Sequence, residues 1–147
     1  MGNEDVGVYS VHLKSNLITR GDKEAEAAKN IQKREVAIAQ LLTHIHDVIG
    51  TTMPTIKRVV IGGDFNTNHG QAMFVAERTL DFLADAGYQN GFEGLSLSER
   101  LTHPGTHGFP RPTFDFIFAK GLTASQPTVT LANGSDHWPV TRSFALH

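Results

Sequence analysis

Acidic, amide and imidazole side chains stand beside apolar runs at four places in this sequence. They are His12, Asp64 with Asn66, Asp115, and Asp136 with His137. The most informative of the four is Asp64 with Asn66, in the segment Val59–Asn66. There, three β-branched apolar residues lead into two glycines and then into a carboxylate and a carboxamide. Carboxylates suit a hard divalent cation, amide and imidazole groups suit phosphate oxygens, and a carboxylate or a histidine can act as a base. Together these side chains are the inventory for metal-assisted hydrolysis of a phosphoester.

Each of these groups also has a structural explanation. Asn66 could cap a following helix, His12 could be an ordinary histidine at the end of a strand, and the polar segment before Trp138 could be only a turn. Asp115 is harder to explain in this way, because it stands in an apolar run and a buried carboxylate is costly unless it is paired. A histidine beside Asp115 would satisfy the carboxylate, which in turn would fix the tautomer of the ring and raise its basicity.

The elements that must position these residues alternate between strand and helix patterns. Strands are predicted over Val6–Leu13, Ile56–Ile61, Thr113–Phe118, Pro127–Leu131 and Trp138–Phe144. Apolar residues at three- and four-residue spacing predict helices over Asp22–Ile49 and Gln71–Ala86. The second helix is predicted to bury Phe74, Val75, Leu80 and Leu83. The two glycines after Ile61 are expected to allow a sharp exit from the strand and a close approach by a ligand. This order predicts the α/β class, with a mixed β-sheet and helices on one face.

Composition limits the remaining possibilities. The 147 residues suffice for a single domain over 1–147, and the absence of cysteine excludes disulfides, thiolate zinc sites and cysteine nucleophiles. Thirteen Lys and Arg against fifteen Asp and Glu give a net charge of −2, which disfavours a protein that grips duplex DNA through a basic surface. The chain contains neither an apolar run long enough to cross a membrane nor a signal-peptide pattern at its start. A soluble chain of unspecified compartment is expected.

Four segments carry a resemblance to a known family. They are Val11–Ser15, Ile61–Asn66, Thr113–Phe118 and Ser135–Val140. In this order they resemble the endonuclease/exonuclease/phosphatase superfamily, whose members share the DNase I-like fold. The most specific element is the pairing of Gly-Asp-Phe-Asn at 63–66 with Ser-Asp-His-x-Pro-Val at 135–140. The resemblance implies hydrolysis of a phosphoester in nucleic acid, a phosphoinositide or a phospholipid head group.

The resemblance also implies roles for the residues that contact water and substrate. Asp64 would orient or deprotonate the attacking water, and Asn66 would bind a phosphate oxygen. His12 would bind the phosphate or assist the leaving oxygen. His137 would contact the scissile phosphate or act as the base, which leaves two candidates for that role.

Two further roles are implied around His137. Asp115 would orient the imidazole ring, and Asp136 would help to hold a divalent metal ion, Mg²⁺ or Mn²⁺. Magnesium binds few protein carboxylates and keeps several waters, so a single carboxylate leaves room for a phosphate oxygen.

The resemblance covers only the C-terminal half of the family pattern. Members carry an N-terminal half with an Asn at the end of the first strand and a metal-binding Glu on a later strand, and neither has a counterpart here. The chain would therefore form about half of a four-layer αββα sandwich and expose an apolar sheet face. The missing N-terminal half or a second copy is expected to pack on that face. The alternative function is a non-catalytic interaction module derived from this fold, and a nucleic-acid-binding domain is a weaker one.

The other histidines carry weaker signals. His44 and His46 are two apart on a predicted helix and face different sides, so they are poor joint ligands. His103 and His107 have the spacing of zinc ligands on a helix, but they stand among prolines and glycines in the irregular stretch 88–112. They are expected in an exposed loop, with lining of the substrate mouth as the alternative.

Overall fold

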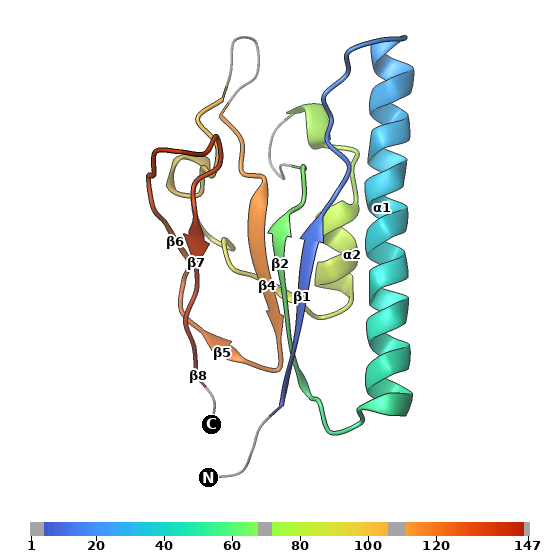
Figure 1. Cartoon of the computed structure of the whole chain (residues 1–147), viewed down its shortest axis with the longest axis vertical. Coiled ribbons are helices and arrows are strands. Elements are labelled where there is room, and N and C mark those ends of the chain that lie inside the picture. The colour runs from blue at the N-terminus through green and yellow to red at the C-terminus, as the bar shows by residue number, and fades with distance from the viewer. Residues whose placement is uncertain (1–4, 68–71, 106–110, 146–147) are drawn as a thin grey trace.

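A four-stranded mixed sheet forms the centre of the computed structural model, which describes residues 5–67, 72–105 and 111–145 (Figure 1). Its strand order is β1-β2-β4-β3, with bounds Val6–His12, Arg58–Asp64, Asp115–Lys120 and Gln89–Asn90. β1 runs parallel to β2, and β4 is antiparallel to both β2 and β3. A parallel pair needs a crossover connection, which the helix between β1 and β2 provides. The predicted fold class, a mixed α/β sheet, is confirmed.

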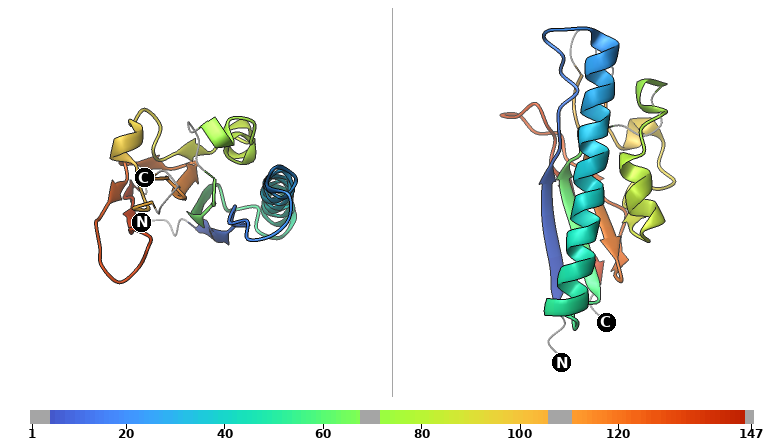
Figure 2. Two further views of the ribbon diagram at one scale, coloured as in Figure 1. Left: turned by 90° about the horizontal axis from the view of Figure 1, so that it is seen from above. Right: turned by 90° about the vertical axis from the view of Figure 1, so that its right-hand side faces the viewer.

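Two helices cover one face of this sheet (Figure 2). They are α1 (Lys23–Asp47), which continues into a π-helical turn at Val48–Thr52, and α2 (Thr79–Asp85). Asp22 caps α1 as its side chain accepts a 2.8 Å hydrogen bond from the Ala25 amide. Alternate strand residues face the helices and form the core with them: Ile38, Ile45, Val59, Ile61, Leu80, Leu83, Phe116 and Phe118. None of the described helices is long and apolar enough to span a lipid bilayer.

The other face of the sheet is partly open. Short strand pairs from the end of the chain lie on that side: β5 (Thr123–Ala124) with β8 (Phe144–Ala145), and β6 (Thr128–Val129) with β7 (Val140–Thr141). β7 contacts β4, whereas β1 lies at the sheet edge and the Val8 side chain on it is 73% exposed. Val8, Val60 and Ala119 are neighbours in register and therefore share this face.

The predicted second helix begins later than expected. Of the predicted range 71–86, residue 71 lies outside the described residues, Ala72–Phe74 form a 3₁₀ turn, and α2 starts only at Thr79. Val75 was expected to be buried but is 85% exposed. The chain turns between these elements and brings Glu77 inward, where its carboxylate pairs with Arg34. A buried guanidinium requires such a partner, and this requirement overrides the local helical pattern.

The predicted exit at the glycines is also wrong. β2 continues through both glycines to Asp64, paired with β1 on one side and with β4 on the other. Gly63 has φ +139°, and a Cβ there would collide with the Val11 carbonyl oxygen. The close approach that glycine permits is therefore by the backbone of the neighbouring strand.

The C-terminal strands are shorter than the apolar pattern predicts. The predicted strand 138–144 is divided into β7, which pairs with β6, and β8, which pairs with β5. Between them, the Arg142 side chain donates hydrogen bonds to the Ser125 and Ile117 carbonyl oxygens at 2.9 and 3.1 Å. Within the irregular stretch 88–112, two elements were not predicted: β3 and a 3₁₀ turn at Leu97–Glu99.

Candidate functional site

Three predicted site residues lie side by side at one end of the sheet. His12 is the last residue of β1, Asp64 is the last of β2, and Asp115 is the first of β4. The strand register pairs His12 with Asp64 and Asp64 with Asp115. Residues paired in register point to the same face, so all three side chains lie on the face that carries no helix. The site therefore lies on rigid backbone at the ends of three adjacent strands.

Asn66 holds the carboxylate of Asp64 in place. The Asn66 backbone amide donates to Asp64 Oδ1 at 2.8 Å, and its side-chain amide donates to Asp64 Oδ2 at 2.9 Å and to the Leu13 carbonyl at 3.0 Å. Asn66 has φ +51°, a left-handed conformation that asparagine tolerates. Because both of its side-chain hydrogens are used, a contact from this amide to a phosphate oxygen would replace one of these bonds. Residues 68–71, which a helix cap at Asn66 would precede, lie outside the described residues.

His137 is oriented by Asp115. The His137 Nδ1 atom lies 2.8 Å from Asp115 Oδ2, which places the proton on Nδ1 and leaves the lone pair on Nε2. His137 Nε2 lies 3.9 Å from Asp64 Oδ2. The Asp115 backbone is itself anchored, because its amide donates to the hydroxyl of the fully buried Thr102 at 3.1 Å. This is a carboxylate–imidazole pair with its free nitrogen directed to a second carboxylate.

The local electrostatics raise the pKa of both Asp64 and His137. Burial raises the pKa of Asp64, and repulsion from Asp115 adds to this, although the hydrogen bond from the Asn66 amide opposes it. Burial alone would lower the pKa of His137. The hydrogen bond that His137 donates to Asp115 and the charges of Asp115, Asp64 and Asp136 outweigh burial, so the net pKa of His137 is raised. The two groups are coupled, because the charge of His137 lowers the pKa of Asp64 and the charge of Asp64 raises that of His137.

His12 and Asp136 lie at the exposed rim of this cluster. His12 Nε2 is 3.6 Å from Asp64 Oδ2, with a side chain that is 79% exposed. The Asp136 side chain is 81% exposed, and its Oδ2 atom lies 4.0 Å from His103 Nε2. Both side chains are accessible to a ligand that approaches from solvent.

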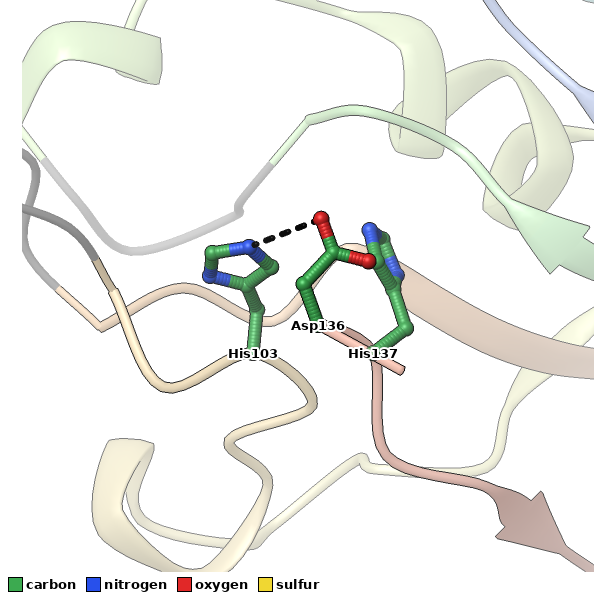
Figure 3. Close-up of side chains that lie close together, drawn as sticks. All are labelled: His103, Asp136 and His137. Atoms are coloured by element: carbon green, nitrogen blue, oxygen red, sulfur yellow. Dashed lines mark ion pairs between the residues drawn. The ribbon is translucent and has the colours of Figure 1, made fainter. Parts of the chain in front are cut away.

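His103 lies at this site, which agrees with the alternative interpretation of the sequence and not with the preferred one. It was expected in an exposed loop, but it is only 9% exposed and lies beside Asp136 and His137 (Figure 3). Its ring centroid is 5.2 Å from that of His137 and 5.7 Å from that of Phe114. The sequence signals at His103 were its spacing from His107 and the length of the irregular connection in which it stands. His107 lies outside the described residues.

Two overlapping groups of residues bring possible ligand atoms close enough together for a metal ion. One contains Asp64, Asp115 and His137, and the other contains His103, Asp136 and His137; in each, the ligand atoms lie within 4.8 Å of one another. In the first group the carboxylates are already engaged by Asn66 and His137. In the second group Asp136 offers an exposed carboxylate with room for water molecules around it.

Comparison with known proteins identifies the fold. No family model and no curated protein matches the chain. Among solved structures, it is similar to TDP2 from Caenorhabditis elegans, with a TM-score of 0.61 and 19% identity over 97% of this chain and 42% of that one. A functionally unknown conserved protein from Enterococcus faecalis gives a TM-score of 0.58 and 20% identity, over 94% of this chain and 49% of that one.

A mannosyl-6-phosphatase from Bacteroides thetaiotaomicron is also similar, with a TM-score of 0.51 and 13% identity over 78% of this chain and 46% of that one. The chain thus spans less than half the length of each of these three structures. At 13–20% identity, these neighbours support the mixed α/β fold of this chain and no more. They say nothing of the substrate of this chain.

Proposed function

We propose that this chain is the C-terminal half of a divalent-metal-dependent phosphoesterase. The observation that carries the proposal is the alignment of His12, Asp64 and Asp115 across three adjacent strands, with His137 bonded to Asp115 at 2.8 Å. Asp64 and Asp115 are both partly buried, and a fold gains no stability from two neighbouring carboxylates in such a place. Their convergence with an oriented histidine is the arrangement that acid–base chemistry requires.

The attacking water would be activated between Asp64 and His137. The 3.9 Å between His137 Nε2 and Asp64 Oδ2 is too long for a direct hydrogen bond. A water or a substrate oxygen beside both atoms could donate a proton to either one. Because the two groups are coupled, the base is best described as the pair, and its apparent pKa values belong to both residues.

The donor set fits Mg²⁺ or Mn²⁺ at Asp136. Magnesium is commonly bound through one or two carboxylates and retains several waters, which matches an exposed carboxylate at the rim of the site. When bound, the metal ion would supply Lewis-acid stabilisation of the phosphate charge. His12, also at the rim, would contact a phosphate oxygen or the leaving oxygen.

The open face of the sheet supports the view that activity requires a partner segment. Val8 is 73% exposed on the face that carries the site, and the chain spans about half the length of the solved structures to which it is similar. An N-terminal half would cover this face and complete the second sheet, and a second copy is the alternative occupant. The substrate class is a phosphoester of nucleic acid, a phosphoinositide or a phospholipid head group.

Hydrolysis of two simple substrates tests the proposal. This chain and an upstream-extended version would be assayed with a nitrophenyl phosphodiester and a nitrophenyl phosphomonoester, with and without Mg²⁺. We expect metal-dependent activity in the extended protein, and Asp64→Asn should reduce it by about 10²–10⁴-fold. Asp47→Asn is the control, since Asp47 is exposed at the end of α1. An inactive extended protein, or full activity in Asp64→Asn, would refute the proposal.

A non-catalytic interaction module is the second candidate, and the same open sheet face favours it. Such a module would bind a partner through this face without using the site. Absence of Mg²⁺ and Mn²⁺ binding, together with normal folding, would support it over the enzyme.

A further inference from the structure

His103 lies beside Asp136, the candidate metal ligand, and the proposed chemistry gives His103 no role. Its side chain is nearly buried, whereas Asp136 is exposed and stands in a loop. Figure 3 shows that the ring and the carboxylate face each other. Within the part of the chain that the structure describes, His103 provides the only side chain recorded within ion-pair distance of Asp136.

The tautomer of His103 follows from one backbone contact. The Gly105 amide donates a hydrogen bond to His103 Nδ1 at 2.9 Å. An Nδ1 atom that accepts this bond carries a lone pair, so the proton of the neutral ring is on Nε2. A protonated ring, or the other tautomer, would set two N–H groups against each other. The atom that faces Asp136 is therefore a hydrogen-bond donor and has no lone pair for a metal.

The ring is also held in a fixed orientation. It packs at 57° against the ring of Phe114 and at 80° against the ring of His137. Phe114 directly precedes β4, and His137 is hydrogen-bonded at 2.8 Å to Asp115, the first residue of β4. Little side-chain entropy remains to be lost when His103 forms a further bond. In this pair the exposed carboxylate of Asp136 is the group that has room to rotate.

We infer that His103 is a positioning residue for Asp136: its Nε2–H donates to one carboxylate oxygen and leaves the other oxygen to the divalent metal ion. The inference rests on the proposed function. Ligating carboxylates are commonly hydrogen-bonded by such outer partners, which fix their orientation. The recorded separation of 4.0 Å exceeds a hydrogen bond by roughly 1 Å, a gap that rotation of the exposed carboxylate can close.

Metal affinity and the ring tautomer provide two independent tests. Mn²⁺ binding would be measured by electron paramagnetic resonance on this chain and on three variants: His103→Phe, His103→Gln and His46→Phe. His103→Phe keeps a planar ring without the donor and should weaken binding by about 10–100-fold. His103→Gln restores an N–H donor and should recover part of the loss. His46 is exposed on α1, so His46→Phe should leave the affinity unchanged.

The ¹⁵N shifts of the His103 ring in the metal-free protein should report protonated Nε2 and unprotonated Nδ1. A proton on Nδ1 would overturn the inference even if His103→Phe fails to fold. Equal Mn²⁺ affinity in the wild type and a folded His103→Phe would overturn it as well while leaving the proposed function intact. If the wild type and the extended protein bind no Mn²⁺, the proposed function itself fails.

Discussion

Replacing Arg34 with methionine tests how the helical layer is attached to the site. Arg34 is fully buried on α1 and donates to both carboxylate oxygens of Glu77 at 2.6 Å. Its third bond, at 2.8 Å, is to the Lys14 carbonyl, two residues beyond His12. The side chain thus joins α1, the turn before α2 and the segment that leaves β1.

The expected cost follows from what the substitution leaves behind. Methionine fills a similar space without charge, so the loss comes from a buried Glu77 carboxylate without its partner. Breaking a buried pair in this way costs about 3–5 kcal/mol. With a urea m-value of about 1–3 kcal/mol/M for a small domain, the unfolding midpoint should fall by roughly 2 M.

Removing both charges should cost less than removing one. In Arg34→Met with Glu77→Met, no charge remains buried, and the main loss is the acceptor of the Thr79 hydroxyl, which donates to Glu77 at 2.6 Å. An unsatisfied buried hydroxyl costs about 1–3 kcal/mol. The double variant is therefore expected to be more stable than Arg34→Met alone.

Urea unfolding followed by circular dichroism and Trp138 fluorescence measures these differences. Lys33→Met is the control on the same helix, because Lys33 is exposed and its replacement should change stability by no more than about 0.5 kcal/mol. A change in Arg34→Met as small as that of the control would refute the reasoning. So would a double variant that is less stable than the single one.

Three further outcomes are expected. In the metal-free protein, NMR titration should give His137 a pKa above its ordinary 6.5, and Asp115→Asn should lower this pKa. Because the folded-state pKa is raised, the stabilisation from the His137–Asp115 pair is complete below pH 6.5. It is lost as the pH rises through the raised value. An unshifted His137 in the wild type would contradict the geometry. Gly63→Ala should severely destabilise the β1–β2 pair, because the added Cβ meets the Val11 carbonyl. In Gly62→Ala the nearest contacts of the Cβ are at 3.6 Å, so the melting temperature should fall much less. Equal melting temperatures of the two variants would refute this. Because Val8 is exposed, Val8→Asp should change the stability of this chain by about 0.5 kcal/mol or less. The same change should reduce the activity of the extended protein. Unchanged activity would argue against coverage of that sheet face.

Local pattern predicted most of the elements and drew attention to the polar residues at the strand ends. The apolar runs before Asp64 and around Asp115 predicted strands, and the three- and four-residue spacing after Asp22 predicted α1, because these signals depend on residues close in sequence. The predicted convergence of His12, Asp64, Asp115 and His137 matches the geometry found. Their assigned roles stay predictions.

Only the tertiary structure decided the contacts between distant segments. The start of α2 depends on Glu77 meeting Arg34, 43 residues away, and no local window contains both charges. The burial of His103 depends on Phe114 and His137 packing around it from other segments. Periodicity reports which side of one element is apolar, whereas the partner of a buried polar group is set by how the elements pack.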